Sequence, residues 1–375
     1  MKIIVSGGGT GGHIYPALTL IRTIQKKVPD AEFLYVGTNA GLESDIIPKE
    51  NLPFTAVDIQ GFQRRFSLAN ILRAGQACCG VLKAMNIVRQ FKPDAAVGTG
   101  GYVCGPILLA ASLLHVPALI QEQNVVAGIT NKILSKFVDR VAIGTEEAAA
   151  LFPAKKVVFT GNPIRPEVMS AEKEDGIKAF GLDRNKKTIL VSGGSRGARS
   201  INKAIIGVLK HYAGSNDVQI LLVTGSNGYD DVMKDIAEAG VNLSEAGNLI
   251  IRPYLYNMPL AMAAADLAVF RAGAIGIAEL MARGIPSVLV PYPYAAENHQ
   301  EFNARAVEKN GAAVLILDKE LSSERLLEVV TDLLNDETKL ENMRRASKTL
   351  GRPKAADEIA DMIIALAQGK EQRNA

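Results

Sequence analysis

Two glycine-rich runs carry the residues best suited to hold a phosphorylated ligand. Gly7–His13 reads GGGTGGH, and Ser192–Arg199 reads SGGSRGAR. Glycines let a ligand approach the backbone closely, and a helix that begins after such a loop favours negative charge at its N-terminus. The second run therefore predicts a diphosphate cradle made by Ser195 and backbone amides. The first run predicts either a ligand-binding loop or a tight turn without a ligand.

The first run also satisfies the GxGxxG pattern of dinucleotide-binding proteins, through Gly7, Gly9 and Gly12. That pattern requires an acidic residue near the end of the second strand, where the acid holds a ribose. Here the second strand is expected to end at Val36–Thr38, which reads VGT and contains no acid. The sequence therefore argues against NAD binding.

Three polar sites follow in the first half of the chain. His13 is one of four histidines. A histidine titrates near neutrality, so it can accept a proton from a hydroxyl group, although it could also be a loop residue that bonds only to the backbone. Gly98–Gly105 (GTGGYVCG) places Tyr102 among glycines, and Gln121–Gly128 (QEQNVVAG) places polar side chains after a buried strand. Buried amides need partners, so Gln121–Gly128 predicts either ligand contacts or a network that orders the loop.

Polar residues in the second half suit a ligand with several hydroxyl groups. Arg271–Gly273 follows an expected strand, and Glu279 lies on the helix that comes next. A carboxylate on the first turns of such a helix can accept two hydrogen bonds from a ribose diol, although an acid there also favours the helix dipole. The run NHQEFN at Asn298–Asn303 offers side chains that could contact sugar hydroxyls.

Short β-branched runs alternate with helical patterns along the whole chain, which predicts parallel sheets covered on both faces. Both halves open with a strand, a glycine run and a helix; the first helix is expected from about Pro16, and the second contains Asn202. We therefore expect an α/β protein of two doubly wound, Rossmann-like domains, with ligands at the carboxyl ends of the strands in a cleft between them. Strands are expected at Lys2–Ser6, Glu32–Val36, Phe54–Ile59, Ala95–Gly98, Ala118–Gln121, Arg140–Ile143, Val157–Thr160, Thr188–Ser192, Gln219–Thr224, Leu249–Arg252, Leu267–Phe270, Ser287–Val290 and Ala313–Leu317.

The domain boundary is expected in the Pro-rich stretch Gly161–Pro166, which reads GNPIRP and would act as a hinge. A length of 375 residues also suggests two domains. The N-terminal domain would comprise residues 1–163 and the C-terminal domain residues 164–350. A last helix at about 352–370 could pack on either domain, and the N-terminal domain is the expected one.

The composition is that of an ordinary globular protein, 48% hydrophobic and 22% charged, with a net charge of +3. Apolar runs such as Ile107–Leu114 are well short of the roughly 20 residues needed to cross a bilayer. The N-terminus lacks the pattern of a secretory signal. The three cysteines, Cys78, Cys79 and Cys104, show no CxxC spacing. They fit reduced thiols in the cytoplasm.

The segment between Asp58 and Asp94 contains basic residues and no acid. A cationic amphipathic surface is attracted to anionic lipid headgroups by about 1 kcal/mol per basic residue, although an ordinary helix with a solvated basic face would look the same. An aromatic content of only 5% and the absence of Trp argue against a nucleic-acid partner. The basic residues are Arg64, Arg65, Arg73, Lys83, Arg89 and Lys92, and they alternate with Phe62, Phe66, Leu68, Ile71, Leu72, Val81, Leu82 and Met85.

Seven segments, in the same order along nearly the whole chain, resemble the MurG family of bacterial peptidoglycan N-acetylglucosaminyltransferases, which belongs to glycosyltransferase family 28. One such segment would be weak, but seven in order are highly specific. They read GGGTGGH, GTGGYVCGP, QEQNVVAGITNK, GNPIRPEV, GGSRGAR, RAGAIGIAEL and NHQEFNARAVEKNGAA.

The resemblance implies the GT-B fold, with an N-terminal acceptor domain and a C-terminal donor domain. It implies a hexosyltransferase that moves N-acetylglucosamine from UDP-N-acetylglucosamine to lipid I, which is undecaprenyl-diphospho-MurNAc-pentapeptide. The product, lipid II, carries a β-1,4 linkage and serves cell-wall synthesis. The resemblance also places the enzyme peripherally on the cytoplasmic face of the membrane. There the basic segment would dock on anionic lipid, with other cell-wall and cell-division proteins as partners.

The family's functional residues carry over by position within the matching segments. The resemblance implies that His13 is the candidate base and that Glu279 holds the ribose beside the reacting centre. Gly101 and Tyr102 would lie on the acceptor side. The residues implied to bind UDP-N-acetylglucosamine are Thr10, Gly11, Gly12, Asn124, Arg165, Ser195, Ile251, Ala274, Glu279, His299 and Gln300.

Two residues depart from the family pattern. Gly276 stands where the family usually has a small hydroxyl residue, and Phe270 stands where it often has Ser or Cys. Because a lost hydroxyl removes one possible hydrogen bond to phosphate, side-chain contacts in this turn are in doubt. Backbone contacts would survive.

The mechanism implied is a single displacement with inversion, in which the acceptor 4-hydroxyl attacks the anomeric carbon and His13 takes its proton. Ser195, the loop amides and Arg165 would hold the leaving UDP charge, and closure about Gly161–Pro166 would gate the step. The sequence has no HExxH run, no Cys/His cluster and no Asp-x-Asp after a strand, which predicts no metal site and no tightly bound cofactor. A Mg²⁺ requirement stays open.

Three other functions remain as alternatives. One is a GT-B lipid glycosyltransferase that acts on diacylglycerol, and another is a UDP-N-acetylglucosamine epimerase of the same fold. The third is a membrane-docking partner of cell-wall enzymes without catalytic activity. The sequence leaves the oligomeric state and the peptide of the acceptor open.

Overall fold

The structure, a computed structural model, describes the backbone of residues 1–57, 68–194 and 197–373. Side chains are described over the same ranges, except at 68–78 and 370–373. The chain divides into two compact units. Unit 1 comprises Met1–Ile164 with Lys354–Ala375, and unit 2 comprises Arg165–Pro353.

Unit 1 is built on a sheet of seven parallel strands in the order β3-β2-β1-β4-β5-β6-β7. Strand order reverses between β1 and β4, so the switch point at which ligands bind in doubly wound sheets lies at the carboxyl ends of these two strands. The strands are β1 (Lys2–Ser6), β2 (Glu32–Gly37), β3 (Phe54–Ala56), β4 (Ala95–Gly98), β5 (Ala118–Glu122), β6 (Arg140–Ile143) and β7 (Val157–Phe159).

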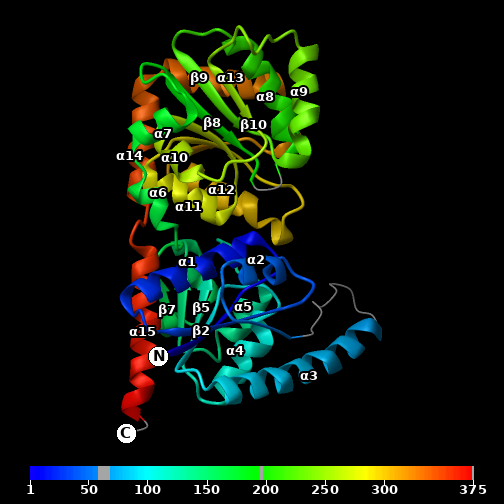
Figure 1. Ribbon diagram of the computed structural model, residues 1–375, viewed down its shortest axis with the longest axis vertical. Helices are drawn as coiled ribbons and strands as arrows, with labels where there is room; N and C mark the ends of the chain where they lie inside the picture. Colours follow the sequence, from blue (N-terminus) through cyan, green and yellow to red (C-terminus); the bar gives the residue numbers. More distant parts are fainter. Residues whose placement is uncertain (58–67, 195–196, 374–375) are drawn as a thin grey trace. The chain divides into compact units, whose positions relative to one another are not determined.

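Helices cover both faces of this sheet (Figure 1). They are α1 (Gly11–Lys27), α2 (Glu43–Lys49), α3 (Leu68–Phe91), α4 (Cys104–Leu113), α5 (Ile129–Leu134) and α15 (Ala355–Arg373), with short 3₁₀ helices η1 (Glu146–Leu151) and η2 (Ala154–Lys156).

Unit 2 repeats the same plan with six parallel strands in the order β10-β9-β8-β11-β12-β13. Its switch point lies between β8 and β11. The strands are β8 (Lys187–Ser192), β9 (Val218–Val223), β10 (Leu249–Arg252), β11 (Leu267–Arg271), β12 (Ser287–Val290) and β13 (Ala313–Leu315).

The helices of unit 2 likewise lie on both faces of its sheet (Figure 1). They are α6 (Pro166–Ser170), α7 (Lys173–Phe180), α8 (Arg199–Tyr212), α9 (Tyr229–Glu238), α10 (Met258–Ala264), α11 (Ala274–Arg283), α12 (His299–Lys309), α13 (Ser323–Asn335) and α14 (Glu337–Leu350), with 3₁₀ helices η3 (Ser226–Gly228), η4 (Ala296–Asn298) and η5 (Asp318–Glu320).

The central strands form because their residues are apolar on both faces. Strand β9 reads VQILLV and β12 reads SVLV, and every residue of both is buried. Parallel strands covered on both sides need such continuous apolar runs. All thirteen strands expected from the sequence are therefore confirmed, and with them the fold class of two doubly wound parallel sheets. The last residues of the expected strand Phe54–Ile59 lie outside the described residues.

Helix α1 begins earlier than the sequence indicated. It starts at Gly11, with Thr10 in an extended conformation before it, and Pro16 lies inside the helix. Proline removes one backbone donor, a loss tolerated best near a helix N-terminus. The correction matters because it moves His13 from a loop to the first turn of a helix.

Helix α15 belongs to unit 1, although unit 2 precedes it in the chain. Ile359, Ala360 and Ile363 are buried in the same core as α1 and β1. The Lys27 ammonium at the end of α1 lies 2.7 Å from Asp361 and 3.2 Å from Asp357. The chain therefore returns to its first unit, and Figure 1 shows α15 (red) beside α1.

Candidate functional site

The first glycine run forms the turn from β1 into α1, at the switch point of unit 1. Gly9 has a φ of +84°, a conformation that favours glycine. The Gly8 N–H donates to the Gly100 carbonyl at 3.3 Å, and the Tyr35 hydroxyl donates to the Gly7 carbonyl at 2.6 Å. The run is thereby tied to the end of β4 and to β2.

His13 extends from the first turn of α1 toward the loop after β4. Its Nδ1 lies 3.0 Å from the Thr99 carbonyl oxygen and 3.2 Å from Gln123 Oε1. Both partners accept hydrogen bonds, so in the neutral ring Nδ1 carries the hydrogen and the lone pair lies on Nε2. This is the tautomer that a base acting through Nε2 requires.

Buried side-chain amides hydrogen-bond to one another and hold Gln123, one of the two acceptors that fix this tautomer. The Gln123 amide donates to the Thr99 carbonyl at 2.6 Å and also to Gln121 Oε1. Gln121 donates in turn to Asn162 Oδ1 at 2.9 Å, and Asn162 donates back to the Gln123 carbonyl at 3.0 Å. A satisfied buried network of this kind is rigid, so the histidine ring has a fixed orientation.

Glu122 orders the polar loop that follows β5. It is buried, and its carboxylate accepts from the Asn124 N–H, the Asn124 side chain, the Gly128 N–H and the Asn131 side chain, at 2.8–3.2 Å. Of the two interpretations of this loop, the structure shows the contacts of a loop-ordering network. A ligand contact by Asn124 stays a prediction.

In the second glycine loop of unit 1, after β4, neighbouring atoms leave no room for a larger side chain at two of the glycines. A Cβ added at Gly100, whose φ is +108°, would lie 2.6 Å from His13 Nδ1, and one at Gly101 would lie 2.5 Å from the Gly8 carbonyl oxygen. Tyr102, the next residue, is exposed. Thr10, Gly11, Gly12, His13, Gly101 and Tyr102 therefore gather at one switch point, as the sequence predicts, and their roles stay predictions.

One buried acid beneath these loops was missed by the sequence analysis. The strand end Gly37–Thr38 indeed lacks an acid, but Glu43 reaches back from the start of α2. Its charge is felt by neighbouring groups. Burial raises the pKa of Cys104 to about 11, and Glu43 adds to that rise. Burial, then Cys104, then Glu43 raise the pKa of Tyr35.

The glycine run of unit 2 follows β8, and Ser195 and Arg196 lie outside the described residues. On either side, Gly194 and Gly197 have φ values of +87° and +74°. A Cβ added at Gly197 would lie 2.1 Å from the Thr224 carbonyl oxygen, so the run passes close to the end of β9. The diphosphate role of Ser195 stays a prediction.

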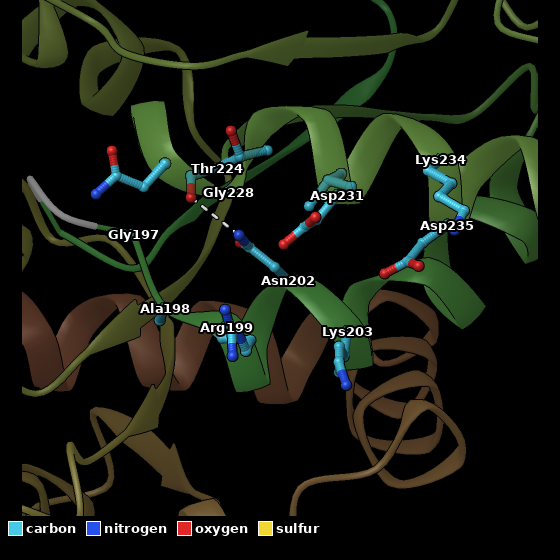
Figure 2. A pocket seen from close by; sticks show the side chains of 12 residues that line it. Gly197, Ala198, Arg199, Asn202, Lys203, Thr224, Gly228, Asp231, Lys234 and Asp235 are labelled. Atoms are coloured by element: carbon cyan, nitrogen blue, oxygen red, sulfur yellow. Dashed lines mark hydrogen bonds between the residues drawn. The ribbon is translucent and has the colours of Figure 1, made fainter.

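A cavity of about 520 Å³ opens beside this run, between α8 and α9 (Figure 2). The Asn202 side chain donates to the Thr224 carbonyl at 2.9 Å, which ties α8 to the end of β9. Lysines and aspartates contribute to the lining of the cavity. Its lining includes Gly197, Arg199, Asn202, Lys203, Thr224, Gly228, Asp231, Lys234 and Asp235.

Arg165 and Glu279, both predicted donor-site residues, form a bidentate ion pair in unit 2. Arg165 Nε lies 2.7 Å from Glu279 Oε1, and a terminal nitrogen lies 2.9 Å from Oε2. The Glu279 side chain is only 4% exposed, against 32% for Arg165. Paired charges in this planar geometry are strongly oriented, so Arg165 fixes the carboxylate that was predicted to hold a ribose.

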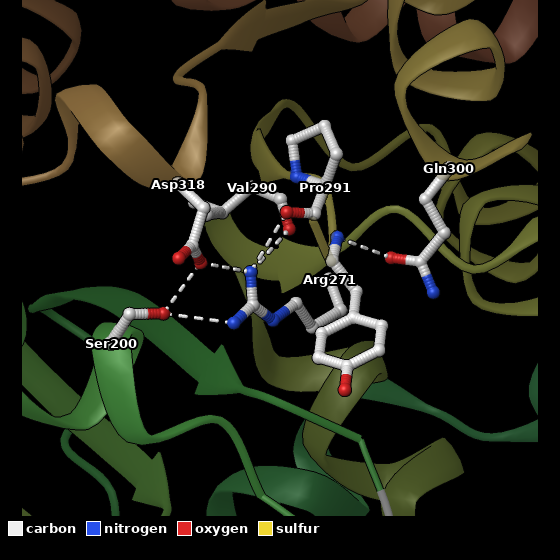
Figure 3. A network of polar contacts seen from close by, with 7 residues as sticks. Ser200, Arg271, Val290, Pro291, Gln300 and Asp318 are labelled. Carbon is white, nitrogen blue, oxygen red and sulfur yellow. Dashed lines mark hydrogen bonds and ion pairs between the residues drawn. The ribbon is translucent and has the colours of Figure 1, made fainter. Parts of the chain in front are cut away.

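Arg271, the last residue of β11, contacts the start of α8, the end of β12 and the start of η5 (Figure 3). Its guanidinium donates to Asp318 at 2.6 Å, to the Pro291 carbonyl at 2.9 Å and to the Ser200 hydroxyl at 2.8 Å. The guanidinium also lies 5.6 Å from the centre of the Tyr292 ring. The sequence noted this arginine only as the start of a turn, because its partners come from residues far away in the chain.

Gln300 and His299 begin helix α12 at the same edge of the sheet. Gln300 Oε1 accepts from the Tyr292 N–H at 2.9 Å, which directs its NH₂ group away from that bond. His299 Nδ1 lies 2.6 Å from the Ala296 carbonyl oxygen, so Nε2 carries the lone pair in the neutral ring. Both residues are partly exposed, and their contact with a sugar stays a prediction.

Ala274 is the first residue of α11, on the same helix as Glu279. Ile251 lies on the edge strand β10, separated from β11 by β9 and β8, and its side chain is in the core. Its contact with uracil was expected through the backbone, and that contact stays a prediction. At Gly276 an added Cβ would meet nothing closer than a Phe270 ring carbon at 4.0 Å. The structure therefore has space for the hydroxyl residue that the family usually places there.

Within the described residues, no group of three or more His, Cys, Asp or Glu side chains could hold a metal ion. No helix in this part of the chain is long and apolar enough to span a bilayer.

Two family descriptions match the chain. Residues 3–143 match "Glycosyltransferase family 28 N-terminal domain", and residues 188–359 match "Glycosyltransferase family 28 C-terminal domain". Together they cover both glycine runs and most of both sheets.

Relatives and solved structures agree with that match. The chain is 49% identical, over 97% of its length and 98% of the relative's, to a UDP-N-acetylglucosamine--N-acetylmuramyl-(pentapeptide) pyrophosphoryl-undecaprenol N-acetylglucosamine transferase of Desulforamulus reducens. The crystal structure of Acinetobacter baumannii MurG superposes with a TM-score of 0.76 at 30% identity, covering 97% of this chain and 99% of that one. A UDP-GlcNAc 2-epimerase from Neisseria meningitidis superposes with a TM-score of 0.65 at 17% identity, covering 97% of this chain and 100% of that one, and shares the fold alone.

Proposed function

Because the chain belongs to glycosyltransferase family 28, we propose that it transfers N-acetylglucosamine from UDP-N-acetylglucosamine to lipid I, the undecaprenyl-diphospho-MurNAc-pentapeptide acceptor. The observation that carries this function is the match, over nearly the full length of both proteins, to a transferase of that name. The protein is a hexosyltransferase of the GT-B fold, and its product is lipid II for peptidoglycan synthesis.

The chemistry that the site supports is a single displacement at the anomeric carbon. The acceptor 4-hydroxyl attacks, its proton passes to Nε2 of His13, and UDP leaves from the opposite face with inversion. What supports His13 in this role is its tautomer. Thr99 and Gln123 accept from Nδ1, so the lone pair is on Nε2 before substrate binds. The same two contacts stabilise the imidazolium after proton transfer.

Donor binding is assigned to unit 2. Glu279 accepts hydrogen bonds from the ribose hydroxyls, and Arg165 acts on the donor by orienting Glu279, since its guanidinium is engaged with that carboxylate. Ser195, the backbone amides of the glycine run after β8 and the N-terminus of α8 stabilise the negative charge of the diphosphate. His299 and Gln300 contact the sugar hydroxyls. We expect no tightly bound cofactor, and assaying turnover with a chelator tests whether Mg²⁺ is required.

Membrane docking is assigned to unit 1, because the acceptor is a lipid. Ile129, Ile133 and Phe137 are exposed and follow one another at helical spacing along α5 and the turn after it. The Ser112 hydroxyl of α4 donates to the Phe137 carbonyl at 2.8 Å, and Leu113, the residue after Ser112, is also exposed. We call these four residues the α5 patch.

Basic residues flank the α5 patch. Lys132 and Lys136 lie between its members in sequence, and the Lys156 ammonium lies 2.9 Å from the Lys136 carbonyl oxygen. Apolar side chains that enter the interface, with cations that contact lipid phosphates around them, suit an anionic membrane surface. This surface would hold the protein peripherally on the cytoplasmic face, where it could meet other cell-wall and division proteins.

Part of the basic segment between Asp58 and Asp94 can be compared with this surface. Lys83, Arg89 and Lys92 are exposed, and so is Leu82 on α3. Arg64 and Arg65 lie outside the described residues, as does the side chain of Arg73. The docking role of the segment stays a proposal, and the α5 patch extends it to a surface that the sequence analysis did not find.

The acceptor specificity is tested by measuring UDP release from UDP-N-acetylglucosamine with a lipid I analogue, with diacylglycerol and with no acceptor. We expect release only with the lipid I analogue. Release with diacylglycerol would support the other lipid glycosyltransferase, and conversion of the donor without an acceptor would support the epimerase. No release under any condition would support a docking partner without catalytic activity.

A further inference from the structure

Glu43 is the most deeply buried carboxylate near the candidate site. It is the first residue of α2, and its relative exposure is 0%. Its Oε2 accepts from the Gly9 N–H at 2.9 Å. Its Oε1 accepts from the Thr38 N–H at 3.0 Å and from the Thr38 hydroxyl at 2.9 Å. The carboxylate therefore connects the first glycine run to the end of β2.

Three glycines leave the space that this side chain fills. A Cβ added at Gly8 would lie 2.5 Å from Glu43 Oε1, one at Gly37 2.5 Å from Cγ, and one at Gly41 2.1 Å from Oε2. The three come from the first glycine run, the end of β2 and the turn before α2. None of the three could carry a larger side chain without displacing the carboxylate, so Glu43 is seated in a backbone-lined recess.

The chemistry of the recess requires a carboxylate. Within the described residues Glu43 has no ion-pair partner, and its three hydrogen bonds come from neutral donors. A carboxylate only accepts, so it satisfies all three, whereas an amide would turn its NH₂ group toward one of them. Burying a charge without a nearby cation costs free energy, so the hydrogen bonds to the carboxylate must offset that cost. One of them, from the Gly9 N–H, is the contact of the carboxylate with the first glycine run.

Gly9 leads directly to two site residues. It precedes Thr10, whose carbonyl accepts from the His13 N–H at 3.1 Å and from the Ile14 N–H at 3.2 Å. The position of Gly9 therefore determines where α1 begins and, with it, the position of the His13 side chain. On the other side, the Gly8 N–H donates to the Gly100 carbonyl at 3.3 Å. The carboxylate thus acts at the residue that joins the two glycine loops of unit 1 to the helix that carries His13.

We propose that Glu43 is a positioning residue for sugar transfer: by accepting from Gly9 and Thr38 it holds the first glycine run and the start of α1 in the geometry that places His13 and Thr10 at the substrate. This proposal rests on the proposed transfer reaction. Glu43 touches no substrate and is not a proton carrier. A misplacement of about 1 Å at a reacting group can lower a rate by about a hundredfold.

The test compares Glu43→Gln with Glu50→Gln. Glu50 lies just after α2, and its carboxylate forms a surface ion pair with Arg22 at 2.5 Å, so it is a matched acid outside the recess. Turnover is measured with saturating UDP-N-acetylglucosamine and a lipid I analogue, and UDP affinity is measured by calorimetry. We expect kcat to fall at least about tenfold in Glu43→Gln. The UDP dissociation constant should change less than about twofold, and Glu50→Gln should match the unsubstituted protein in both.

The split between kcat and UDP affinity separates positioning from a merely structural role. UDP lacks the transferred N-acetylglucosamine, and its binding is assigned to unit 2. Its stoichiometry therefore counts the folded donor sites, and its affinity shows whether those sites are intact. A loss of turnover per UDP-binding site is the result that supports the proposal. Unchanged kcat in Glu43→Gln would overturn it, and so would an equal loss of kcat and of UDP binding. If the unsubstituted protein releases no UDP with the lipid I analogue, the proposed function fails instead.

Thr38→Val provides a second variant that keeps the carboxylate. It removes only the hydroxyl donor, so the protein should fold, and we expect a smaller fall in kcat of about threefold to tenfold. Because Thr38 would act through Glu43, the double variant should be no slower than Glu43→Gln alone. If the two substitutions lower kcat independently, so that their fold-changes multiply in the double variant, the positioning role is contradicted. It is also contradicted if Thr38→Val leaves kcat unchanged.

Discussion

Glu279 carries the clearest constraint at the scale of single residues, because Arg165 engages both of its carboxylate oxygens. A ribose diol would have to share the lone pairs that remain. Replacing Glu279 with Gln removes the charge and one acceptor while keeping the shape. A hydrogen bond to a charged group contributes about 1.5–3 kcal/mol, so we expect UDP affinity to fall by about 10- to 100-fold.

Calorimetry with UDP measures this loss, and Glu341→Gln is the control. Glu341 forms an exposed ion pair with Arg345 at 3.1 Å, in the same unit, and exposed pairs contribute little. Equal UDP affinity in Glu279→Gln and Glu341→Gln would show that the Arg165–Glu279 pair is structural.

Cys104 predicts how the free energy of unfolding depends on pH. Its thiol is buried and lies 3.0 Å from the carbonyl oxygens of Ser6 and Gly100, and burial raises its pKa from 9.0 to about 11. The folded protein therefore keeps this proton at a pH where the unfolded chain has lost it. Stability from this group is fully present below about pH 9 and is lost as the pH rises toward 11, a change of about 3 kcal/mol.

Unfolding by urea at pH 8 to 11 measures the slope, with Cys104→Ala as the comparison. The variant should be less stable at pH 8 because of the cavity, but its stability should fall less steeply as the pH rises. Burial is the largest cause of the raised pKa of Tyr35 and acts in both proteins, whereas the smaller contribution of Cys104 to that rise is lost in the variant. Parallel pH curves would contradict the assignment.

The residue types at the site could be predicted from the sequence, but most of their partners could not. His13 and Glu279 stand out because their types suit the chemistry and they follow glycine-rich turns. Glu43 and Arg271 do not, because their contacts depend on which strands are neighbours. Glu43 reaches Gly9 across 34 residues because β2 lies beside β1. The two glycines shortly before the acid, Gly37 and Gly41, were the signal that could have indicated it.

At the scale of elements, the loop after β4 depends on one glycine in particular. Gly100→Ala adds a Cβ that would lie 2.6 Å from His13 Nδ1, in a residue with a φ of +108°. Gly214→Ala is the control, because Gly214 also has a positive φ, of +72°, and an added Cβ there meets nothing within 4 Å. Both substitutions cost about 1 kcal/mol or more of stability through the backbone.

Only Gly100→Ala should lower kcat, by about tenfold or more, because only it displaces the histidine. Thermal unfolding measures the shared loss of stability, and UDP release measures turnover. If both variants lose the same turnover, backbone strain rather than the position of His13 explains the effect.

Strands were easier to predict than helix ends. Short continuous apolar runs such as ILLV in β9 are typical of buried parallel strands. The start of α1 was misjudged because Pro16 is a helix-start signal, and GGHIY before it carries two glycines. Tertiary contacts overrode that propensity. Thr99 Oγ1 donates to the His13 carbonyl at 2.7 Å, and such a contact cannot be seen in a local pattern.

At the scale of the whole molecule, the account predicts where the protein meets the membrane. Substituting both Ile133 and Phe137 with Glu places two charges in the α5 patch, where apolar groups should enter the lipid interface. Sedimentation with vesicles that contain phosphatidylglycerol measures binding, and we expect it to fall at least about tenfold. Met169→Glu is the control, because Met169 is an exposed apolar residue of unit 2.

UDP affinity of each variant checks that the protein is folded. Equal vesicle binding by the Ile133 and Phe137 double variant and by Met169→Glu would remove the α5 patch from this role.

The two-unit plan could be predicted because strand, glycine run and helix recur in the same order in each half. The docking surface could be predicted only in part. The segment between Asp58 and Asp94 was identified by its charge, whereas α5 is only six residues long and follows a polar loop, so its pair of exposed isoleucines gave no helical signal.

The most direct test of the account is turnover per bound donor in His13→Ala. UDP release with UDP-N-acetylglucosamine and a lipid I analogue is divided by the number of donor sites that calorimetry counts. The account predicts a fall of about a hundredfold or more with unchanged donor affinity, because only the base is lost. Near-normal turnover per site would contradict it.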